Sequence, residues 1–150
     1  MLVYRITRKR YATDLSGIGA EKYPGRWNLP EYRMLYTADS ESLATLEVLA
    51  HFDDEEAPAD QCVVVLDIPD KLIHQLKHLP KEWDFTPAGL ASKYAGTEFL
   101  KAAKHLVLKV PSAIIKSEYN YLINPLHPAM SQVKIAKTYD KLWDERILGR

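Results

Sequence analysis

The sequence predicts an α+β domain in which short strands and helices are mixed around a sheet. Strands are indicated by apolar–polar alternation at Leu2–Thr7 and by the β-branched run Cys62–Ile68. A helix is indicated at Glu41–Phe52, directly after the N-cap candidates Asp39 and Ser40. Because these elements do not alternate strictly as β–α–β units, an α+β arrangement is favoured over a doubly wound sheet.

The remaining elements follow from the same periodicity and from turn residues. Residues Tyr11–Pro30 carry three glycines and two prolines and are predicted to form one long loop. A helix is expected from Thr86–Pro87, with proline at its first position, to about Lys104, with a break near Gly96. Pro69–Leu79 and the tail Asp140–Arg150 are left undecided between helix and extended chain. Further short strands are predicted at Met34–Thr37, His105–Val110, Tyr121–Ile123 and Val133–Ala136.

Length and composition indicate a single domain over residues 1–150. The chain has 150 residues, 47% of them hydrophobic and 27% charged, which is ordinary for a globular protein. Twenty Lys and Arg balance twenty Asp and Glu, so the bulk positive charge that drives nucleic-acid binding is missing, and no direct nucleic-acid binding is expected. No signal peptide and no apolar run near the ~20 residues of a membrane span are recognised, so a cytoplasmic protein without membrane contact is expected.

Disulfide and metal chemistry are not predicted. Cys62 is the single cysteine and lies in an apolar run, so a buried, inert thiol is expected. The five histidines show no zinc-type spacing: His74 and His78 are four residues apart, but Gln75 stands where a His-Glu-x-x-His site needs glutamate.

Glu47 is the unusual residue of the predicted helix Glu41–Phe52. At about 100° per residue, Glu47 lies roughly 40° from Leu43, within the stripe that also holds Leu46 and Ala50. Thr45, together with Glu41, falls on the opposite side and is expected to face solvent.

A carboxylate on an interior face needs a hydrogen-bond donor or a neutralising partner, because an unpaired buried charge is costly. His51 stands four residues after Glu47, one turn along the helix. The helix alone therefore allows either a structural Glu47–His51 pair or a catalytic carboxylate that faces a cleft.

Three other segments carry side chains with chemical potential. In Gly25–Asn28 an arginine that can hold phosphate or carboxylate precedes an aromatic ring, although an arginine packed on Trp27 for structural reasons fits equally. Ser112 follows a predicted strand, where serine is usually a turn former. In the rigid turn Asn124–Pro128, Asn124 and His127 are turn formers or site residues.

Taken together and in order, these segments resemble the RES domain, a bacterial toxin family named for an Arg, a Glu and a Ser. No single motif is specific, and the middle of the chain contributes little; the ordered set carries the resemblance. The one departure is Leu29–Pro30–Glu31, where many relatives carry a glycine. The segments are Tyr4–Ile6, Gly25–Asn28, Leu35–Ala38, Ala44–His51, Val110–Ile114, Asn120–Pro128 and Asp144–Leu148.

The resemblance implies a fold similar to that of ADP-ribosyltransferases and an enzyme that consumes NAD⁺ by hydrolysis or phosphorolysis. Arg26, Glu47 and Ser112 match the naming residues, and Tyr36 matches a further active-site tyrosine. Trp27 and Asn124 are expected to contact substrate beside them. His51 is expected to support the site from behind.

The chemistry expected from this resemblance needs no metal and no strong general acid, because nicotinamide leaves NAD⁺ as a cationic pyridinium. An ionised Glu47 would stabilise an oxocarbenium-like transition state. Arg26 would hold the pyrophosphate, Tyr36 would stack on nicotinamide, and Ser112 would contact the ribose or orient the carboxylate rather than act as a nucleophile.

The resemblance also implies a helix-turn-helix antitoxin of the Xre type that blocks the site; a homodimer is left open. A protein ADP-ribosyltransferase that uses the same pocket is one alternative. A non-catalytic module that binds a partner through its loops is another. A ribonuclease-type toxin is disfavoured by the neutral charge.

Overall fold

Seven strands form one mixed sheet in the computed structural model of the chain, which describes residues 1–52 and 59–148. The spatial order is β4-β5-β6-β2-β1-β3-β7; β4 pairs with β5 in parallel, and the other neighbours pair antiparallel. The strands are β1 Leu2–Arg8, β2 Leu35–Ala38, β3 Gln61–Asp67, β4 Ile73–Gln75, β5 Val107–Pro111, β6 Tyr119–Ile123 and β7 Lys134–Asp140.

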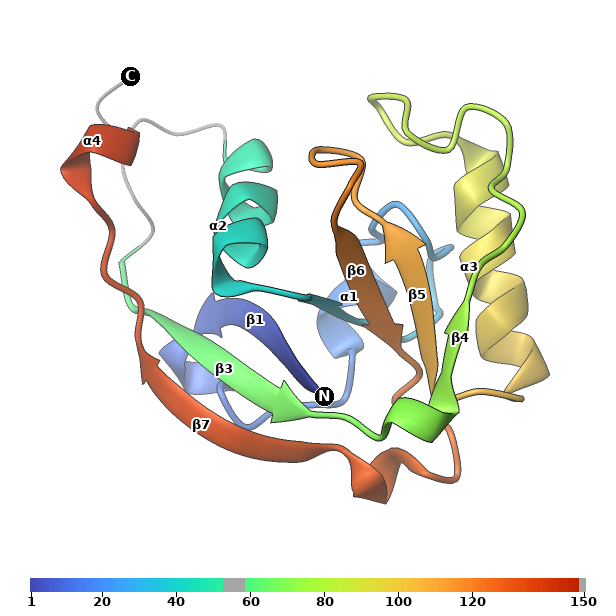
Figure 1. Cartoon of the computed structure of the whole chain (residues 1–150), viewed down its shortest axis with the longest axis horizontal. Helices are drawn as coiled ribbons and strands as arrows, with labels where there is room; N and C mark the ends of the chain where they lie inside the picture. Colours follow the sequence, from blue (N-terminus) through green and yellow to red (C-terminus); the bar gives the residue numbers. More distant parts are fainter. Residues whose placement is uncertain (53–58, 149–150) are drawn as a thin grey trace.

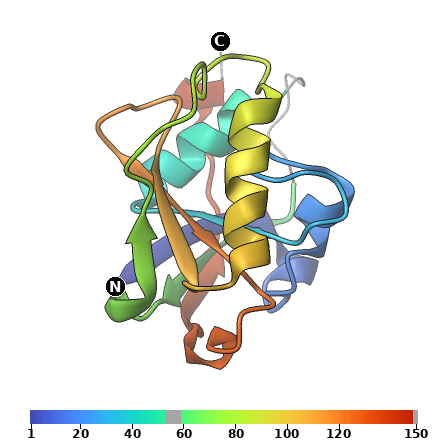
Figure 2. The same cartoon turned by 90° about the vertical axis from the view of Figure 1, so that its right-hand side faces the viewer.

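Two longer helices flank this sheet. Figure 1 shows α2 (Glu41–Ala50) above β1 and β2, and α3 (Leu90–Ala102) beside β4 and β5. Seen from the side, α3 stands in front of β5 and β6 (Figure 2). Shorter helices are α1 Ile18–Lys22 and α4 Glu145–Leu148, with 3₁₀ turns at Lys9–Tyr11, Asp70–Leu72 and Met130–Gln132. The predicted α+β class with a mixed sheet and flanking helices is confirmed, although all described strands join a single sheet.

The two faces of the sheet carry separate apolar clusters, because side chains alternate along a strand. On β6, Tyr121 and Ile123 join the cluster that contains Val3, whereas Leu122 joins Trp27 and the buried side chains beneath α3. Asn120 has the same parity as Leu122, so it faces the side of the sheet that carries α3 and the Trp27 loop.

All six predicted strands are confirmed, with ends shifted by at most four residues. The predicted long loop contains the short helix Ile18–Lys22. The undecided segment after Pro69 forms a 3₁₀ turn followed by β4. The undecided tail contains α4; its last two residues, 149–150, lie outside the described part.

The prediction for α3 was wrong at its start and at its middle. The helix begins at Leu90, with Gly89 as its N-cap, and the Thr86–Pro87 bond before it is cis. Gly96 does not break the helix. Its role is close packing, because a Cβ at this position would lie 1.8 Å from the backbone oxygen of Trp27.

The predicted faces of α2 were also wrong in part. Ser40 is the N-cap as expected, its hydroxyl accepting the Leu43 N–H at 3.1 Å. Thr45, however, is only 9% exposed, while Leu46 is 40% exposed and Ala50 is also exposed. β7, which pairs with β3, brings Tyr139 onto Glu41, and Lys141 just after it bonds Thr45. Helical periodicity cannot foresee these tertiary contacts.

Cys62 is buried at 2% exposure, as the sequence predicted. Among the described residues, the helices are all too short or too polar to cross a bilayer.

Candidate active site

Glu47 is held by two hydrogen-bond donors that converge on one of its carboxylate oxygens. The Ser112 hydroxyl donates to Glu47 Oε1 at 2.8 Å, and the Asn120 amide Nδ2 donates to the same oxygen at 2.6 Å. Glu47 itself is half-buried on α2, opposite the ends of β5 and β6. Within the described residues, the hydrogen bonds of this carboxylate fall on Oε1, and Oε2 accepts none there.

Ser112 is fully buried in the turn that follows β5. Its oxygen accepts the backbone N–H groups of Ile114 and Ile115, both at 3.1 Å, while its proton goes to Glu47. A hydroxyl that accepts two N–H groups is a stronger donor to a third partner, because hydrogen bonds in a chain polarise one another. This geometry suits a residue that orients a carboxylate, and it is unsuited to a nucleophile, whose oxygen would have to be exposed.

Asn120 is a site residue that the sequence analysis did not single out, although it begins a segment that carried the family resemblance. Its Oδ1 is buried and has no hydrogen-bond partner among the described residues. Turning the amide over would place Oδ1 against Glu47 Oε1, and two acceptors repel each other. The orientation shown lets the Asn120 amide donate to the carboxylate.

Tyr36 lies beside this cluster and is fixed by the Gly25–Asn28 loop. Its hydroxyl donates to Asn28 Oδ1 at 2.7 Å and accepts the Trp27 N–H at 3.0 Å. Gly25 packs on the phenol ring, and a Cβ there would lie 2.6 Å from Tyr36 Cζ. Burial raises the pKa of the Tyr36 hydroxyl above its ordinary value, so the group stays protonated at neutral pH.

Asn28 organises the same loop. It is 0% exposed, and its Nδ2 donates to the carbonyls of Ala20, Leu29 and Tyr32 while Oδ1 accepts the Gly25 N–H at 2.9 Å. These bonds satisfy backbone groups of an irregular segment that would otherwise be buried without partners. These hydrogen bonds hold the shape of the loop.

Arg26 points its guanidinium toward a second loop. Its NH1 donates to the carbonyl oxygen of Trp83 at 2.9 Å and to that of Phe85 at 2.6 Å. The next residue, Trp27, stacks on Trp83 with ring centroids 6.2 Å apart. The sequence left open that Arg26 packs on Trp27; in the structure Arg26 bonds the carbonyls of the second loop, and Trp27 stacks on Trp83 of that loop.

The register of the sheet brings the Glu47 and Tyr36 groups to the same face. Asn120 pairs with Ala38 on β2, two residues after Tyr36, and Tyr36 pairs with Leu122. Side chains two apart on a strand share a face and are about 7 Å apart. Glu47 and Ser112, which contact each other, therefore lie on the same face of the sheet as Tyr36. The Tyr36 hydroxyl in turn accepts the N–H of Trp27, the residue that follows Arg26.

His51 and Asn124 are not brought into this cluster. His51 is the exposed C-cap of α2, and the donors to Glu47 are Ser112 and Asn120. Asn124 follows the opposite end of β6, where its Nδ2 donates to the Leu100 carbonyl and its Oδ1 accepts the Leu126 N–H. In this structure Asn124 holds a turn, and Asn120 occupies the position beside the carboxylate.

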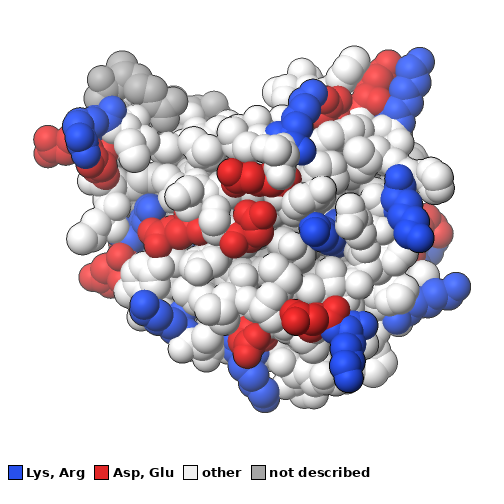
Figure 3. Space-filling model, in the orientation of Figure 1, with Lys and Arg blue, Asp and Glu red and all other residues white. Residues whose placement is uncertain are grey.

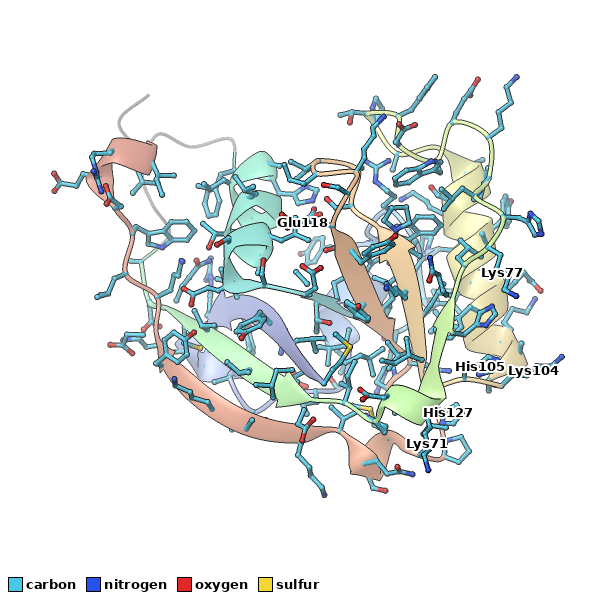
Figure 4. All side chains as sticks on the ribbon, in the orientation of Figure 1. Lys71, Lys77, Lys104, His105, Glu118 and His127 are labelled. Atoms are coloured by element: carbon cyan, nitrogen blue, oxygen red, sulfur yellow. The ribbon has the colours of Figure 1, made fainter. Side chains whose placement is uncertain are left out.

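The surface around the site carries charges of both signs. Figure 3 shows red side chains near the centre of this face, with blue side chains among them and along the right-hand edge. Figure 4 places Glu118 between α2 and β6, so a second carboxylate lies on this side of the molecule. No sequence signal marked Glu118, because it precedes a short strand without a recognisable motif.

A separate cavity of about 430 Å³ lies between β4 and α3. His105 and Lys104 mark it at the foot of α3 in Figure 4, and the His105 ring stacks on His74 at 4.7 Å. Glu98 and Lys104 both line it, so it has no clear preference for charge, and it contains none of the predicted site residues. Across residues 1–52 and 59–148, three or more His, Cys, Asp or Glu side chains do not gather in a way that could hold a metal ion.

The RES domain family matches residues 2–144. The chain belongs to the RES family.

Its curated relatives are similar over most of their length. A Prs ADP-ribosylating toxin of Sphingobium sp. is 35% identical over 93% of this chain and 89% of its own. Proteins named Toxin Res from Yersinia enterocolitica and Pseudomonas putida are both 38% identical, over 85% and 90% of this chain and 86% and 92% of their own. The expected membership of the family is thereby confirmed.

A solved structure supports the fold as well. A chain of the M. tuberculosis MbcT–MbcA toxin–antitoxin complex superposes with a TM-score of 0.77 over 99% of this chain and 86% of its own. The two share 18% sequence identity, so the likeness concerns the fold.

Proposed function

We propose that this RES-family protein is a toxin that depletes NAD⁺ by cleaving the bond between nicotinamide and ribose. The observation that carries the proposal is the fixed carboxylate of Glu47. Two donors hold its Oε1, while Oε2 is left to face a ligand. Such a group is suited to stabilising positive charge on a sugar, because it needs no reorganisation when the charge develops.

In the proposed reaction Glu47 Oε2 accepts a hydrogen bond from a hydroxyl of the nicotinamide ribose. As the C1–N bond breaks, the electron pair leaves with nicotinamide, and the sugar acquires oxocarbenium character that the carboxylate stabilises. Ser112 and Asn120 orient the carboxylate, and a water or inorganic phosphate oxygen then bonds to C1. Phosphate would yield a phosphorylated ADP-ribose, and water would yield ADP-ribose and a proton.

Arg26 would bind the pyrophosphate through its remaining edge. NH1 is committed to the Trp83 and Phe85 carbonyls, so Nε and NH2 are the donors that can bind a phosphate in a bidentate manner. Tyr36 would offer an aromatic surface to the nicotinamide half of the substrate. Trp27, which the sequence analysis expected to contact substrate, is only 3% exposed and stacks on Trp83, so it would shape the loop without touching substrate.

A second candidate function uses the same site to transfer ADP-ribose to a protein. It is favoured by one observation, the 35% identity with a relative named as a Prs ADP-ribosylating toxin. The chemistry differs only in the acceptor that bonds to C1.

As a toxin of this family, the protein is expected to act in the cytoplasm and to be neutralised by an antitoxin of the Xre helix-turn-helix type. The fold likeness to a chain of a toxin–antitoxin complex supports an antitoxin partner.

The test is incubation of purified protein with NAD⁺, with and without inorganic phosphate, and identification of the products by mass spectrometry. Release of nicotinamide with ADP-ribose or its phosphate supports NAD⁺ depletion. Label from NAD⁺ appearing mainly on added protein would favour the second candidate. Intact NAD⁺ under all conditions would reject both.

A further inference from the structure

The segment 80–85, called the strap below, is tied to the candidate site at three places. Arg26 donates to two of its carbonyls, and Trp27 stacks on its Trp83 ring. Asp84 forms an ion pair with Lys116, which lies in the turn between β5 and β6. Figure 1 shows both loops at the upper edge of the molecule, the strap before α3 and the turn above β5 and β6.

The contacts of Arg26 give the strap a direct link to substrate binding. Both protons of NH1 go to strap carbonyls, so the strap fixes the rotation of the guanidinium plane. The Nε–NH2 edge is thereby aimed in one direction. A bidentate contact with phosphate depends on this direction, because its two N–H groups must point at the phosphate together.

The Asp84–Lys116 pair links the strap to the other half of the site. Lys116 follows directly on Ile114 and Ile115, whose N–H groups bind Ser112 Oγ, and Ser112 donates to Glu47. A continuous series of contacts therefore runs from Arg26 through the strap and this ion pair to Glu47. The Lys116 hydrogen bond also keeps the pKa of Asp84 below its ordinary value.

We infer that Asp84 and Lys116 are positioning residues that set the placement of Arg26 relative to Glu47. The inference rests on the proposed function, in which Arg26 and Glu47 bind two different parts of one substrate. A mispositioned binding group costs affinity even when the fold is intact. Asp84 and Lys116 would thus act through Arg26 without touching substrate.

The alternative is an ordinary surface ion pair. Lys116 is 67% exposed and Asp84 is 23% exposed, and exposed pairs contribute little to stability. The two readings differ in the quantity that changes: a surface pair affects neither substrate affinity nor turnover, whereas a positioning pair affects the KM.

The experiment compares D84N, K116M and the reversed pair D84K/K116D in NAD⁺ consumption. Each single variant is expected to raise the KM about fivefold, the scale of losing one exposed charge pair, with kcat changed by less than about threefold. The reversed pair is expected to bring the KM most of the way back to the wild-type value. Added salt should reduce the difference in KM between the wild-type protein and the single variants. The matched control is K101M, which removes the exposed Lys101–Glu98 pair on α3 and should leave the KM unchanged.

A second readout separates this inference from the proposed function. Hydrogen exchange of the strap amides and binding of ADP-ribose are measured for the same variants without turnover. Faster strap exchange together with weaker ADP-ribose binding supports the inference. Unchanged ADP-ribose affinity and unchanged KM in both single variants would overturn it. If the wild-type protein neither cleaves NAD⁺ nor binds ADP-ribose, the proposed function fails, and the positioning role fails with it even where strap exchange changes.

Discussion

The amide of Asn120 and the hydroxyl of Ser112 donate to the same oxygen of Glu47, at 2.6 and 2.8 Å. Asn120 lies on β6, and Ser112 lies in the turn that joins β5 to β6. The sheet therefore holds a carboxylate that α2 supplies. The predictions below follow from this arrangement and from the packing that supports it.

Asn120→Ala is expected to lower kcat about tenfold or more and to change the free energy of unfolding by less than about 1 kcal/mol. The variant removes one of the two donors that orient Glu47, and it also removes the unpaired Oδ1. Steady-state NAD⁺ consumption and urea unfolding measure the two quantities.

Asn124→Ala is the matched control for Asn120→Ala, since Asn120 lies near the start of β6 and Asn124 directly follows its end. Asn124 bonds the Leu100 carbonyl and the Leu126 N–H, so its loss should destabilise the fold and leave kcat near the wild-type value. A larger loss of kcat at Asn124 than at Asn120 would show that the substrate lies at the other end of the strand.

Ser112→Ala should reduce both activity and stability. The buried hydroxyl donates to Glu47 and accepts two N–H groups of its own turn, and these would lose their partner. A loss of about 1–3 kcal/mol in unfolding free energy is expected, with a fall in kcat measured at a temperature where the variant is folded. Wild-type kcat in the folded variant would argue against any role of Ser112 in orienting the carboxylate.

Gly96→Ala is expected to destabilise the protein by about 3 kcal/mol or more, because the new methyl group would meet the Trp27 carbonyl at 1.8 Å. Denaturant unfolding gives the measurement. Gly19→Ala in α1 is the control, since its Cβ would have nothing within 4 Å, and its effect should stay within about 1 kcal/mol. Equal stability of the two variants would contradict the close packing of α3 on the Trp27 loop.

Glu41→Gln is expected to lower stability at neutral pH and to have no effect in acid. Hydrogen bonds from Tyr139 and Lys141 lower the pKa of Glu41 below its ordinary 4.5, against the opposing effect of burial. A depressed folded-state pKa gives stabilisation that is complete above about pH 4.5 and is lost as the pH falls through the lower folded value.

The measurement is the unfolding free energy of both proteins between about pH 3 and 7, with an expected difference of at most about 1 kcal/mol at the upper end because the pair is partly exposed. A difference that grows as the pH falls would contradict the assigned role of Glu41.

Local sequence signals predicted the strands and α2 well, because their periodicity and caps are properties of short segments. Ser40 and the run at Cys62 are examples. The face of α2 could not be predicted, since Thr45 is covered by Lys141, which lies 96 residues further along the chain. Gly96 was misinterpreted for the same reason: its close neighbour, Trp27, comes from a distant loop.

The candidate site shows the same division. Glu47 stood out as a carboxylate on a predicted interior face, and Ser112 through the family resemblance, and the structure brings the two together. Asn120 and the strap could not be singled out from sequence alone. An asparagine on a short strand has no signal of its own, and the strap is defined by backbone carbonyls that any sequence carries.

The most direct test is the rate of NAD⁺ loss with purified wild-type protein and with Glu47→Gln, both shown to be folded by circular dichroism and thermal unfolding. The carboxamide keeps the size of the side chain and removes the charge that would stabilise the oxocarbenium-like sugar. A decrease of at least about 10²-fold in kcat is predicted, the scale of losing one transition-state stabiliser. NAD⁺ loss at the wild-type rate in the folded variant would contradict the role of this carboxylate.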